Sequence, residues 1–323
     1  MNFNAIVGNP PYQEMDGGAK NSAKPLYNIF IEQSKRLQPD YLSMISPARW
    51  YAGGKGLDAF REEMLNDERI AKLVDFADAK DCFTGVNIAG GVFYFLWDSN
   101  HEGNCEVSNF FNNKIQSTVS RSLNEFKFFV RNNTAVSIIK KCIGSNEETM
   151  EDMVSSRNMF GIATTTKGKT EPFENSIEAL TSKGTIYLSP DEIADKGEYL
   201  DKYKVIITYA MSGGNKPNKS GQYKITSSMQ VLKPYYACSE TYLCIGRFDN
   251  EKDAENLKSY ISTKTFRFLL LQALTSIHIT KDKFCFIPKQ DFSKSWTDQE
   301  LYKKYEFTED EINYIENLIT PAD

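Results

Sequence analysis

The tetrapeptide Asn9-Pro10-Pro11-Tyr12 combines groups that can hold an aromatic amine for reaction. The amine of a base such as adenine is a poor nucleophile, because its lone pair is delocalised into the ring. The Asn9 side-chain oxygen and the Pro10 carbonyl can each accept one N–H, and the prolines fix their own φ, so both acceptors are pre-organised. Tyr12 offers a flat face for an extruded base. These residues predict direct methyl transfer to a base amine, without a metal or covalent intermediate.

A strand is expected to position this tetrapeptide. Residues 3–7 (FNAIV) form a short apolar run closed by Gly8 and the prolines, which is typical of a buried parallel strand. Active-site loops of open α/β sheets follow the carboxyl ends of strands. The placement therefore favours a functional loop over the alternative that two prolines only stiffen a turn.

The following hundred or so residues alternate between helical and strand patterns. We expect helices over 24–37 and 57–65, and strands over 41–47, 70–77 and 90–98. The last two strands are too close in sequence for a crossover helix, so they should be antiparallel neighbours. The pattern predicts an α/β fold: the carboxyl half of a doubly wound sheet, with parallel strands and a final antiparallel pair.

A second domain of α+β type is expected after a polar connection. We predict a partial catalytic domain over 1–112, a connection with one helix (near 134–142) over 113–150, and the second domain over 151–323. The second domain mixes short strands with buried helices, such as 265–274. It ends in a helix that starts at a capping box formed by Thr308 and Glu311.

The tetrapeptide resembles the catalytic motif of the gamma-class N6-adenine DNA methyltransferases, especially those of fused, Type IIG restriction-modification enzymes. The segments ISPARWYAGGKGLDAFREEML and CFTGVNIAGGVFYFLW, and residues 157–169, 239–270 and 286–319, are also similar to this family. The resemblance implies that Asn9 to Tyr12 are catalytic, and that Phe83, otherwise a core residue, lines the target-base pocket. It further implies site-specific adenine methylation of double-stranded DNA with S-adenosylmethionine, in a restriction-modification system, and a target-recognition domain over 151–323.

One part of the family pattern is missing. In the enzymes that the chain resembles, the Gly-rich loop and the acidic residues that bind S-adenosylmethionine precede the catalytic motif, whereas eight residues precede Asn9. We therefore expect a cofactor site that is only partly encoded here, an unpaired edge on the strand 3–7, and an upstream segment or partner chain that completes the enzyme. The alternative is a catalytically incomplete DNA-recognition module. A methyltransferase acting on RNA or on a protein amide is disfavoured.

Lysine, arginine and asparagine residues of the second domain are candidates for DNA contact, because these side chains bond base edges and reach phosphates. The candidates are Arg157, Lys167, Lys169, Asn215, Lys216, Asn218 and Lys219. Between Asp201 and Lys233 six lysines stand against one acid, which suggests a phosphate-contacting loop. For each of these residues, the alternative to a DNA contact is a position in a solvated loop. His278, between two isoleucines, is expected to be a half-buried strand residue.

Composition excludes several classes of protein. The net charge of −5 argues against indiscriminate coating of nucleic acid. No apolar run reaches the roughly 20 residues of a membrane span, so we expect a cytoplasmic protein. The six cysteines and two histidines form no metal-ligand cluster, and neither a disulfide nor a metal site is expected. No nuclease motif stands out.

Overall fold

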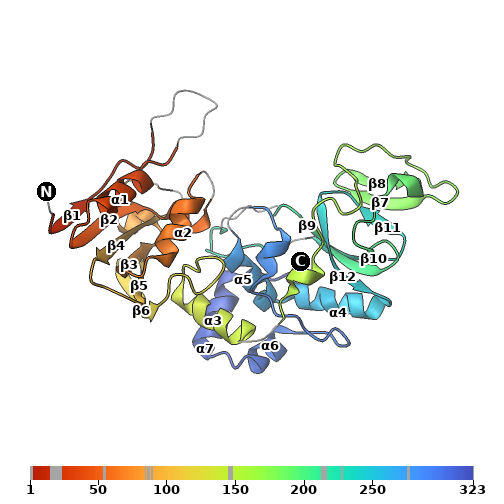
Figure 1. Cartoon of the computed structure of the whole chain (residues 1–323). Coiled ribbons are helices and arrows are strands. Elements are labelled where there is room, and N and C mark those ends of the chain that lie inside the picture. Colours follow the sequence, from red (N-terminus) through yellow and green to blue (C-terminus); the bar gives the residue numbers. More distant parts are fainter. Residues whose placement is uncertain are drawn as a thin grey trace. The chain divides into compact units, whose positions relative to one another are not determined.

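The computed structural model describes residues 3–14, 24–53, 56–83, 85, 88, 90–144, 148–211, 217–226, 228–274 and 277–322. The chain divides into two compact units, Met1–Val136 (unit 1) and Ser137–Asp323 (unit 2). Figure 1 shows unit 1 in red to yellow and unit 2 in yellow-green to blue. Each unit is described by itself.

Unit 1 is built on a six-stranded sheet with the order β1-β2-β4-β3-β5-β6. β1 (Ala5–Gly8), β2 (Tyr41–Pro47) and β3 (Ile70–Phe76) run in one direction, because β1 is parallel to β2 and β4 (Val92–Asp98) is antiparallel to both β2 and β3. The expected antiparallel pair is therefore confirmed. The carboxyl ends of β1, β2 and β3 share one edge of the sheet.

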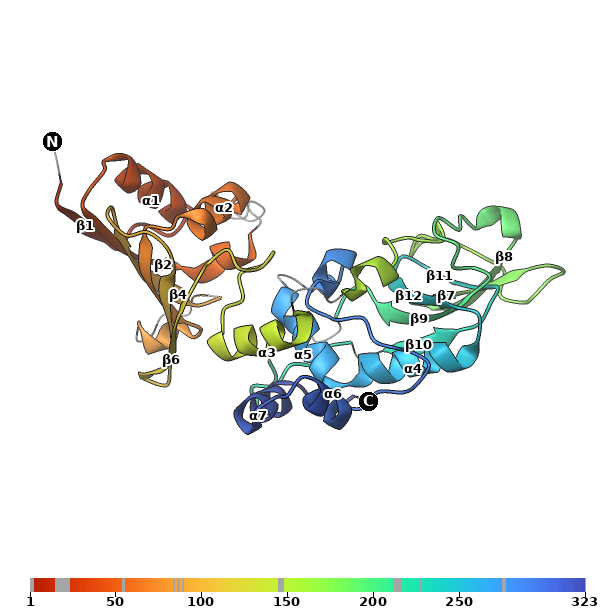
Figure 2. The same cartoon turned by 60° about the horizontal axis from the view of Figure 1, so that its bottom comes forward.

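Two amphipathic helices cover one face of this sheet. α1 (Tyr27–Arg36) and α2 (Asp58–Asn66) direct Ile31, Phe60 and Met64 into a core with Phe93 and Phe95. Figure 2 shows both helices on the same side of the strands. The other face is more open, as the 80% exposure of Val7 and the 40% exposure of Tyr94 show.

Residues 105–121, which extend into the connection expected over 113–150, belong to the sheet of unit 1. They form a hairpin of β5 (Cys105–Phe111) and β6 (Lys114–Arg121), turned at Asn112 and Asn113 with φ of 51° and 60°. Asparagine tolerates these left-handed conformations, which tight hairpin turns require. β6 is an exposed edge strand with mostly polar residues, so its sequence resembles a loop. The expected helix exists as α3 (Asn133–Ile143), and the two units divide inside it.

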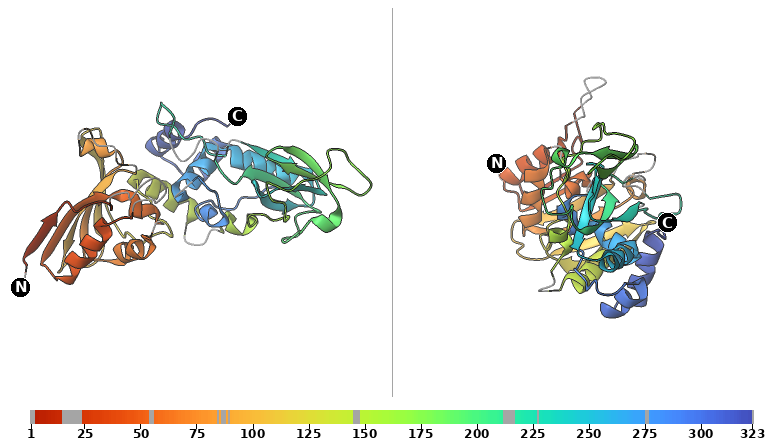
Figure 3. Two further views of the ribbon diagram at one scale, coloured as in Figure 1. Left: turned by 90° about the horizontal axis from the view of Figure 1, so that it is seen from above. Right: turned by 90° about the vertical axis from the view of Figure 1, so that its right-hand side faces the viewer.

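Unit 2 contains two three-stranded sheets. The first has the order β10-β9-β12 (Met229–Leu232, Tyr203–Thr208 and Tyr242–Phe248) and is antiparallel. The second has the order β11-β7-β8 (Tyr236–Cys238, Ile177–Thr181 and Gly184–Leu188). Helix α4 (Glu251–Ser262) packs against all three strands of the first sheet. Figure 3 shows this helix alongside the strands.

Three further helices follow α4. In α5 (Lys264–Ala273) the side chains of Phe266, Phe268 and Leu270 are completely buried, which confirms the expected buried helix. α6 (Asp298–Lys304) leads to α7 (Glu309–Leu318), and α7 begins at the predicted capping box of Thr308. Among the described residues, none of the helices is both long and apolar enough to cross a bilayer.

The lysine-rich stretch from Asp201 to Lys233 is not one loop. Its ends are strands β9 and β10, and Lys202 pairs with Asp249 at 2.9 Å. Lys204 is completely buried, and its Nζ donates to the carbonyls of Lys202 and Lys233 at 3.1 Å each. The local charge excess therefore overstated the number of lysines free to contact a phosphate, because charge counts do not report burial.

Burial lowers the pKa of Lys204 from 10.5 to about 8. Between these values the unfolded chain binds more protons than the folded chain, so the contribution of Lys204 to stability rises with pH in this window. Relative to a Lys204→Met variant, the natural chain should gain about 3 kcal/mol of unfolding free energy between pH 8 and pH 10.5. Urea denaturation of both proteins across this range measures the difference, and a difference that does not change with pH contradicts the assignment.

Candidate active site and nucleic-acid contacts

The tetrapeptide lies in the loop that follows β1. Pro10 is buried, Tyr12 is partly buried, and Asn9 and Pro11 are exposed. The Leu26 N–H donates to the Tyr12 carbonyl at 3.1 Å, which ties the loop to the start of α1. The residues expected to hold a base amine thus follow the carboxyl end of an edge strand, and the Asn9 side chain is accessible.

The loop that follows β3 comes close to Tyr12. Burial raises the pKa of Tyr12, and the neighbouring Cys82 thiol adds to this rise. Cys82 precedes Phe83, whose N–H donates to the Ala79 carbonyl at 2.8 Å in the 3-10 helix η2 (Ala79–Asp81). The Phe83 ring packs against a small apolar cluster that includes Val92, but it stays partly exposed. Cys82 therefore connects the two segments, since it acts electrostatically on Tyr12 and directly precedes Phe83.

Arg131 fastens the base of the loop that carries Phe83. Its Nε donates to Asp75 Oδ2 at 2.6 Å, Nη1 to the Gly90 carbonyl at 2.7 Å, and Nη2 to the Phe76 carbonyl at 3.0 Å. One guanidinium thus bonds Asp75 and Phe76 at the end of β3 and also Gly90, which lies just before β4. We call this arrangement the Arg131 clamp. The Arg131 clamp could not be predicted from local patterns, because its partners are 41 to 56 positions away.

Gly91 makes the clamp possible. It has a φ of +76°, and a Cβ atom built there would lie 2.1 Å from the Phe76 carbonyl oxygen. A side chain at this position would therefore push the two ends of the loop apart.

Several buried polar atoms around this edge of the sheet have no hydrogen-bond partner among the described residues. They include Tyr12 OH, Asn28 Oδ1, Ser46 Oγ and Trp50 Nε1. Buried polar groups are normally paired with protein, ordered water or a ligand. Ser46 is near the carboxyl end of β2, and Trp50 lies in the 3-10 helix η1 (Ala48–Ala52) that follows β2. Two of the orphaned atoms therefore belong to the end of β2 and the segment that follows it.

A pocket of about 460 Å³ in unit 1 lies at the opposite edge of the sheet, where β3 begins. It is lined by Asp67, Arg69 and His101, among others. Burial opposes ionisation of Asp67, but hydrogen bonds from Arg69, Lys35 and Trp97 lower its pKa to about 2. This network ties α1 to the strands, so we interpret it as structural.

The candidate DNA contacts of unit 2 differ in their surroundings. Lys167 and Lys219 are exposed. Lys169 is also exposed, but its Nζ lies 4.2 Å from the centre of the Phe173 ring. Arg157 pairs with Glu240 at 2.9 Å.

Asn218 has a local role in its turn. Its Oδ1 accepts hydrogen bonds from the backbone N–H groups of Ser220 and Gln222, each at 2.9 Å. This is the turn-forming geometry that asparagine favours. Asn215 and Lys216 lie outside the described residues.

Comparison with known proteins bears on the first part of the chain most directly. Residues 1–83 match the family model described as Eco57I restriction-modification methylase. Over 163 residues the chain is 34% identical to an "uncharacterized adenine-specific methylase" of Mycoplasma pneumoniae. That alignment covers 49% of this chain and 39% of the relative, so the chain spans about two fifths of the relative's length. The expected likeness to adenine-specific restriction-modification methylases is confirmed at this level.

Two solved restriction enzymes show a looser likeness. The type IIG restriction endonuclease BpuSI has a TM-score of 0.39 and 12% identity, over 94% of this chain and 49% of that one. The Type IIL restriction-modification enzyme MmeI in complex with DNA has a TM-score of 0.40 and 8% identity, over 85% and 45%. At these scores the likeness supports no functional conclusion.

Proposed function

We propose that this chain supplies the target-base pocket and the DNA-recognition part of a site-specific N6-adenine DNA methyltransferase in a restriction-modification system. The observation that carries the proposal is the Asn9 to Tyr12 loop at the carboxyl end of β1, inside the segment that matches the methylase family. The 34% identity to an adenine-specific methylase supports adenine as the base.

In this proposal the loop orients the adenine amine. Asn9 Oδ1 and the Pro10 carbonyl each accept one N–H, and the amine lone pair is then directed at the incoming methyl group. Tyr12 stacks on the extruded base, and Phe83 contacts its other side. S-adenosylmethionine supplies the electrophilic methyl group. The orphaned polar atoms near Ser46 and Trp50 fit a polar ligand at this edge of the sheet.

We infer that the cofactor site is completed by an upstream segment or a partner chain. Among the described residues β1 is the outermost strand and pairs with β2 alone, so its other edge can accept a further strand. Val7 on this strand is 80% exposed, which suits a surface that another element covers. A DNA-recognition module without activity of its own remains the alternative function.

Methyl transfer distinguishes the two functions. Tritiated methyl groups should pass to DNA when this chain is combined with its upstream portion or partner. The catalytically incomplete alternative predicts specific DNA binding by the same assembly without transfer. Matched assays of the chain alone test the inference about the cofactor site, which is wrong if the chain alone binds S-adenosylmethionine with micromolar affinity.

Unit 2 is proposed to bind double-stranded DNA through lysines of the segment after β9. Replacing Lys216, Lys219, Lys224 and Lys233 with alanine should weaken DNA binding and reduce the steepness of its salt dependence. Fewer phosphates are then neutralised, so binding releases fewer counterions. Affinities measured at four or more salt concentrations give the slope. A Lys252→Ala, Lys258→Ala variant on α4, which removes half as many charges, controls for the change in net charge. An unchanged slope in the first variant removes this segment from the interface.

A further inference from the structure

Three side chains from distant segments of unit 2 are stacked together. The Arg157 guanidinium carbon lies 4.6 Å from the centre of the Tyr209 ring. The Tyr209 and His278 ring centres are 4.9 Å apart, with an interplanar angle of 21°. We call these three residues the Arg157 stack. The half-buried strand residue expected at position 278 is instead an exposed histidine that packs on a tyrosine.

Backbone hydrogen bonds hold the aromatic part of the Arg157 stack in place. The Ile279 N–H donates to the Tyr209 carbonyl at 2.8 Å, and the Met211 N–H donates to the Ile277 carbonyl at 2.9 Å. These two bonds flank His278 on both sides. The Tyr209 N–H also donates to the Thr241 carbonyl at 2.7 Å. The two rings are therefore presented on fixed backbone and not on a loose loop.

The guanidinium itself is also oriented. Arg157 Nη2 lies 2.9 Å from Glu240 Oε2, and the other carboxylate oxygen accepts the Thr164 N–H at 3.1 Å. The Arg157 side chain is nevertheless 51% exposed. Arginine has five N–H donors, so one pairing with Glu240 leaves further donors directed to solvent.

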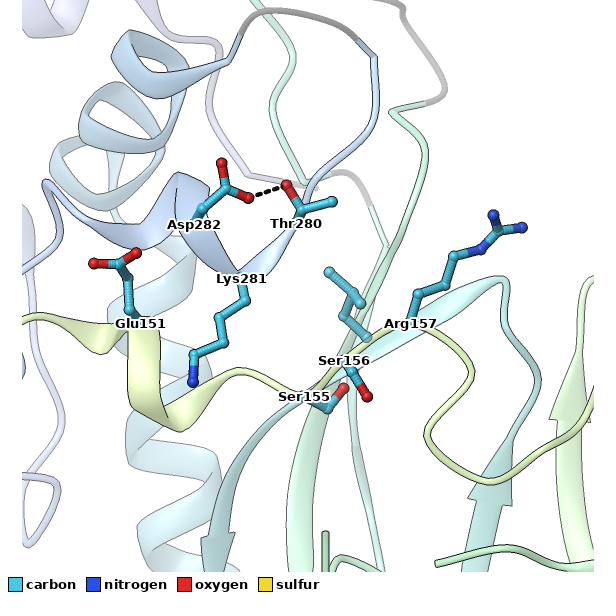
Figure 4. A pocket seen from close by; sticks show the side chains of 8 residues that line it. Glu151, Ser155, Ser156, Arg157, Thr280, Lys281 and Asp282 are labelled. Carbon is cyan, nitrogen blue, oxygen red and sulfur yellow. Dashed lines mark hydrogen bonds between the residues drawn. The ribbon is translucent and has the colours of Figure 1, made fainter. Parts of the chain in front are cut away.

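Arg157 borders a pocket of about 340 Å³. Figure 4 shows its side chain pointing away from Lys281 on the opposite wall. Asn158 Oδ1 and Thr208 Oγ1, which are next to Arg157 and Tyr209 in the chain, are buried without a partner among the described residues. Ordered water or a polar ligand is the usual partner of such atoms.

We propose that Arg157 reads a guanine in the target duplex and that Tyr209, His278 and Glu240 fix the plane of its guanidinium. This inference rests on the proposed function, in which unit 2 recognises DNA. Two parallel N–H donors of arginine match O6 and N7 of guanine in the major groove. That pairing needs the guanidinium plane to coincide with the base plane, and an aromatic stack supplies this orientation. A phosphate contact has no such requirement, since it is satisfied by charge from many directions.

The test is selection of bound duplexes from a random pool by the full chain. The natural chain should enrich a site that contains a required guanine. Arg157→Ala should lose about 10- to 100-fold of the preference at that guanine and keep the preferences elsewhere. Arg157→Lys keeps the charge but lacks the planar fork of donors that the tyrosine ring orients, so it should weaken the preference. Tyr209→Phe keeps the ring and should retain it, whereas Tyr209→Leu should weaken it.

Arg247 offers a matched control, because it also lies over a tyrosine ring, at 5.5 Å from Tyr199, in the same unit. Arg247→Ala should leave the enriched site unchanged. The inference is overturned if Arg157→Ala enriches the same site equally, or if it weakens all sequences uniformly, which indicates a phosphate contact. If the natural chain enriches no sequence, the recognition part of the proposed function fails, and the role of Arg157 fails with it.

Discussion

Replacing Asn9 with alanine is expected to abolish methyl transfer by the complete enzyme while DNA binding stays nearly intact. The side chain is exposed in the loop after β1, and under the proposed function it supplies one of the two acceptors for the target amine. Loss of one pre-organised hydrogen-bonding group in an active site lowers turnover by about 100- to 1,000-fold. Single-turnover transfer of tritiated methyl groups and a separate duplex-binding titration measure the two quantities.

A matched control residue, Asn4, directly precedes β1 at its amino end. Asn4 is also exposed, and its Nδ2 donates to Asp40 at 3.0 Å, away from the tetrapeptide. Asn4→Ala should keep the turnover of the natural enzyme. Asn9→Asp keeps an acceptor oxygen and should retain more activity than Asn9→Ala. Full activity of Asn9→Ala means that the loop does not hold the reacting amine.

Breaking the Arg131 clamp is expected to have the largest effect on stability. The side chains of Asp75 and Arg131 are 3% and 29% exposed, so Arg131→Met leaves a buried carboxylate without its cation. Removal of one partner from a buried pair destabilises a protein by about 3–5 kcal/mol. Urea denaturation followed by tryptophan fluorescence measures this change. In a Trp296→Phe background the signal comes from Trp50 and Trp97, which both lie in unit 1.

The neighbouring pair Lys72–Glu106 is the natural comparison for the clamp. It joins β3 to β5 at 3.1 Å, but its side chains are 55% and 48% exposed. Lys72→Met should therefore change the unfolding free energy by less than about 1 kcal/mol. Adding Asp75→Asn to Arg131→Met should recover part of the lost stability, because the unpaired charge is removed. A loss below about 1 kcal/mol for Arg131→Met alone contradicts the clamp.

The apolar patterns were sufficient to predict the centre of unit 1. Strands were expected over 41–47, 70–77 and 90–98, and the structure has them at Tyr41–Pro47, Ile70–Phe76 and Val92–Asp98. These strands are buried by helices on one face, so their sequences carry the hydrophobic signal of a core. Within the hairpin that was missed, β6 gives no such signal, because it is an exposed edge strand with mostly polar residues.

The parts of the site that depend on distant contacts could not be predicted. Arg131 bonds residues 41 to 56 positions away, and the Arg157 stack joins segments near positions 157, 209 and 278. Local composition does not indicate contacts between residues so far apart in the sequence. The same limit explains Lys204, which the charge pattern counted as solvent-facing although tertiary packing buries it completely. The position of the tetrapeptide after a strand could be predicted, because the apolar run and the prolines that indicate it are local.

The identity of the methylated base tests the central claim most directly. Duplex DNA labelled with tritiated methyl groups by this chain, together with its upstream portion or partner, is digested to nucleosides and separated by chromatography. The Asn9 to Tyr12 loop predicts that the label elutes as N6-methyldeoxyadenosine and disappears with Asn9→Ala. Label on cytosine would contradict the account. Equal labelling of adenine by the Asn9→Ala variant and the natural chain would contradict it as well.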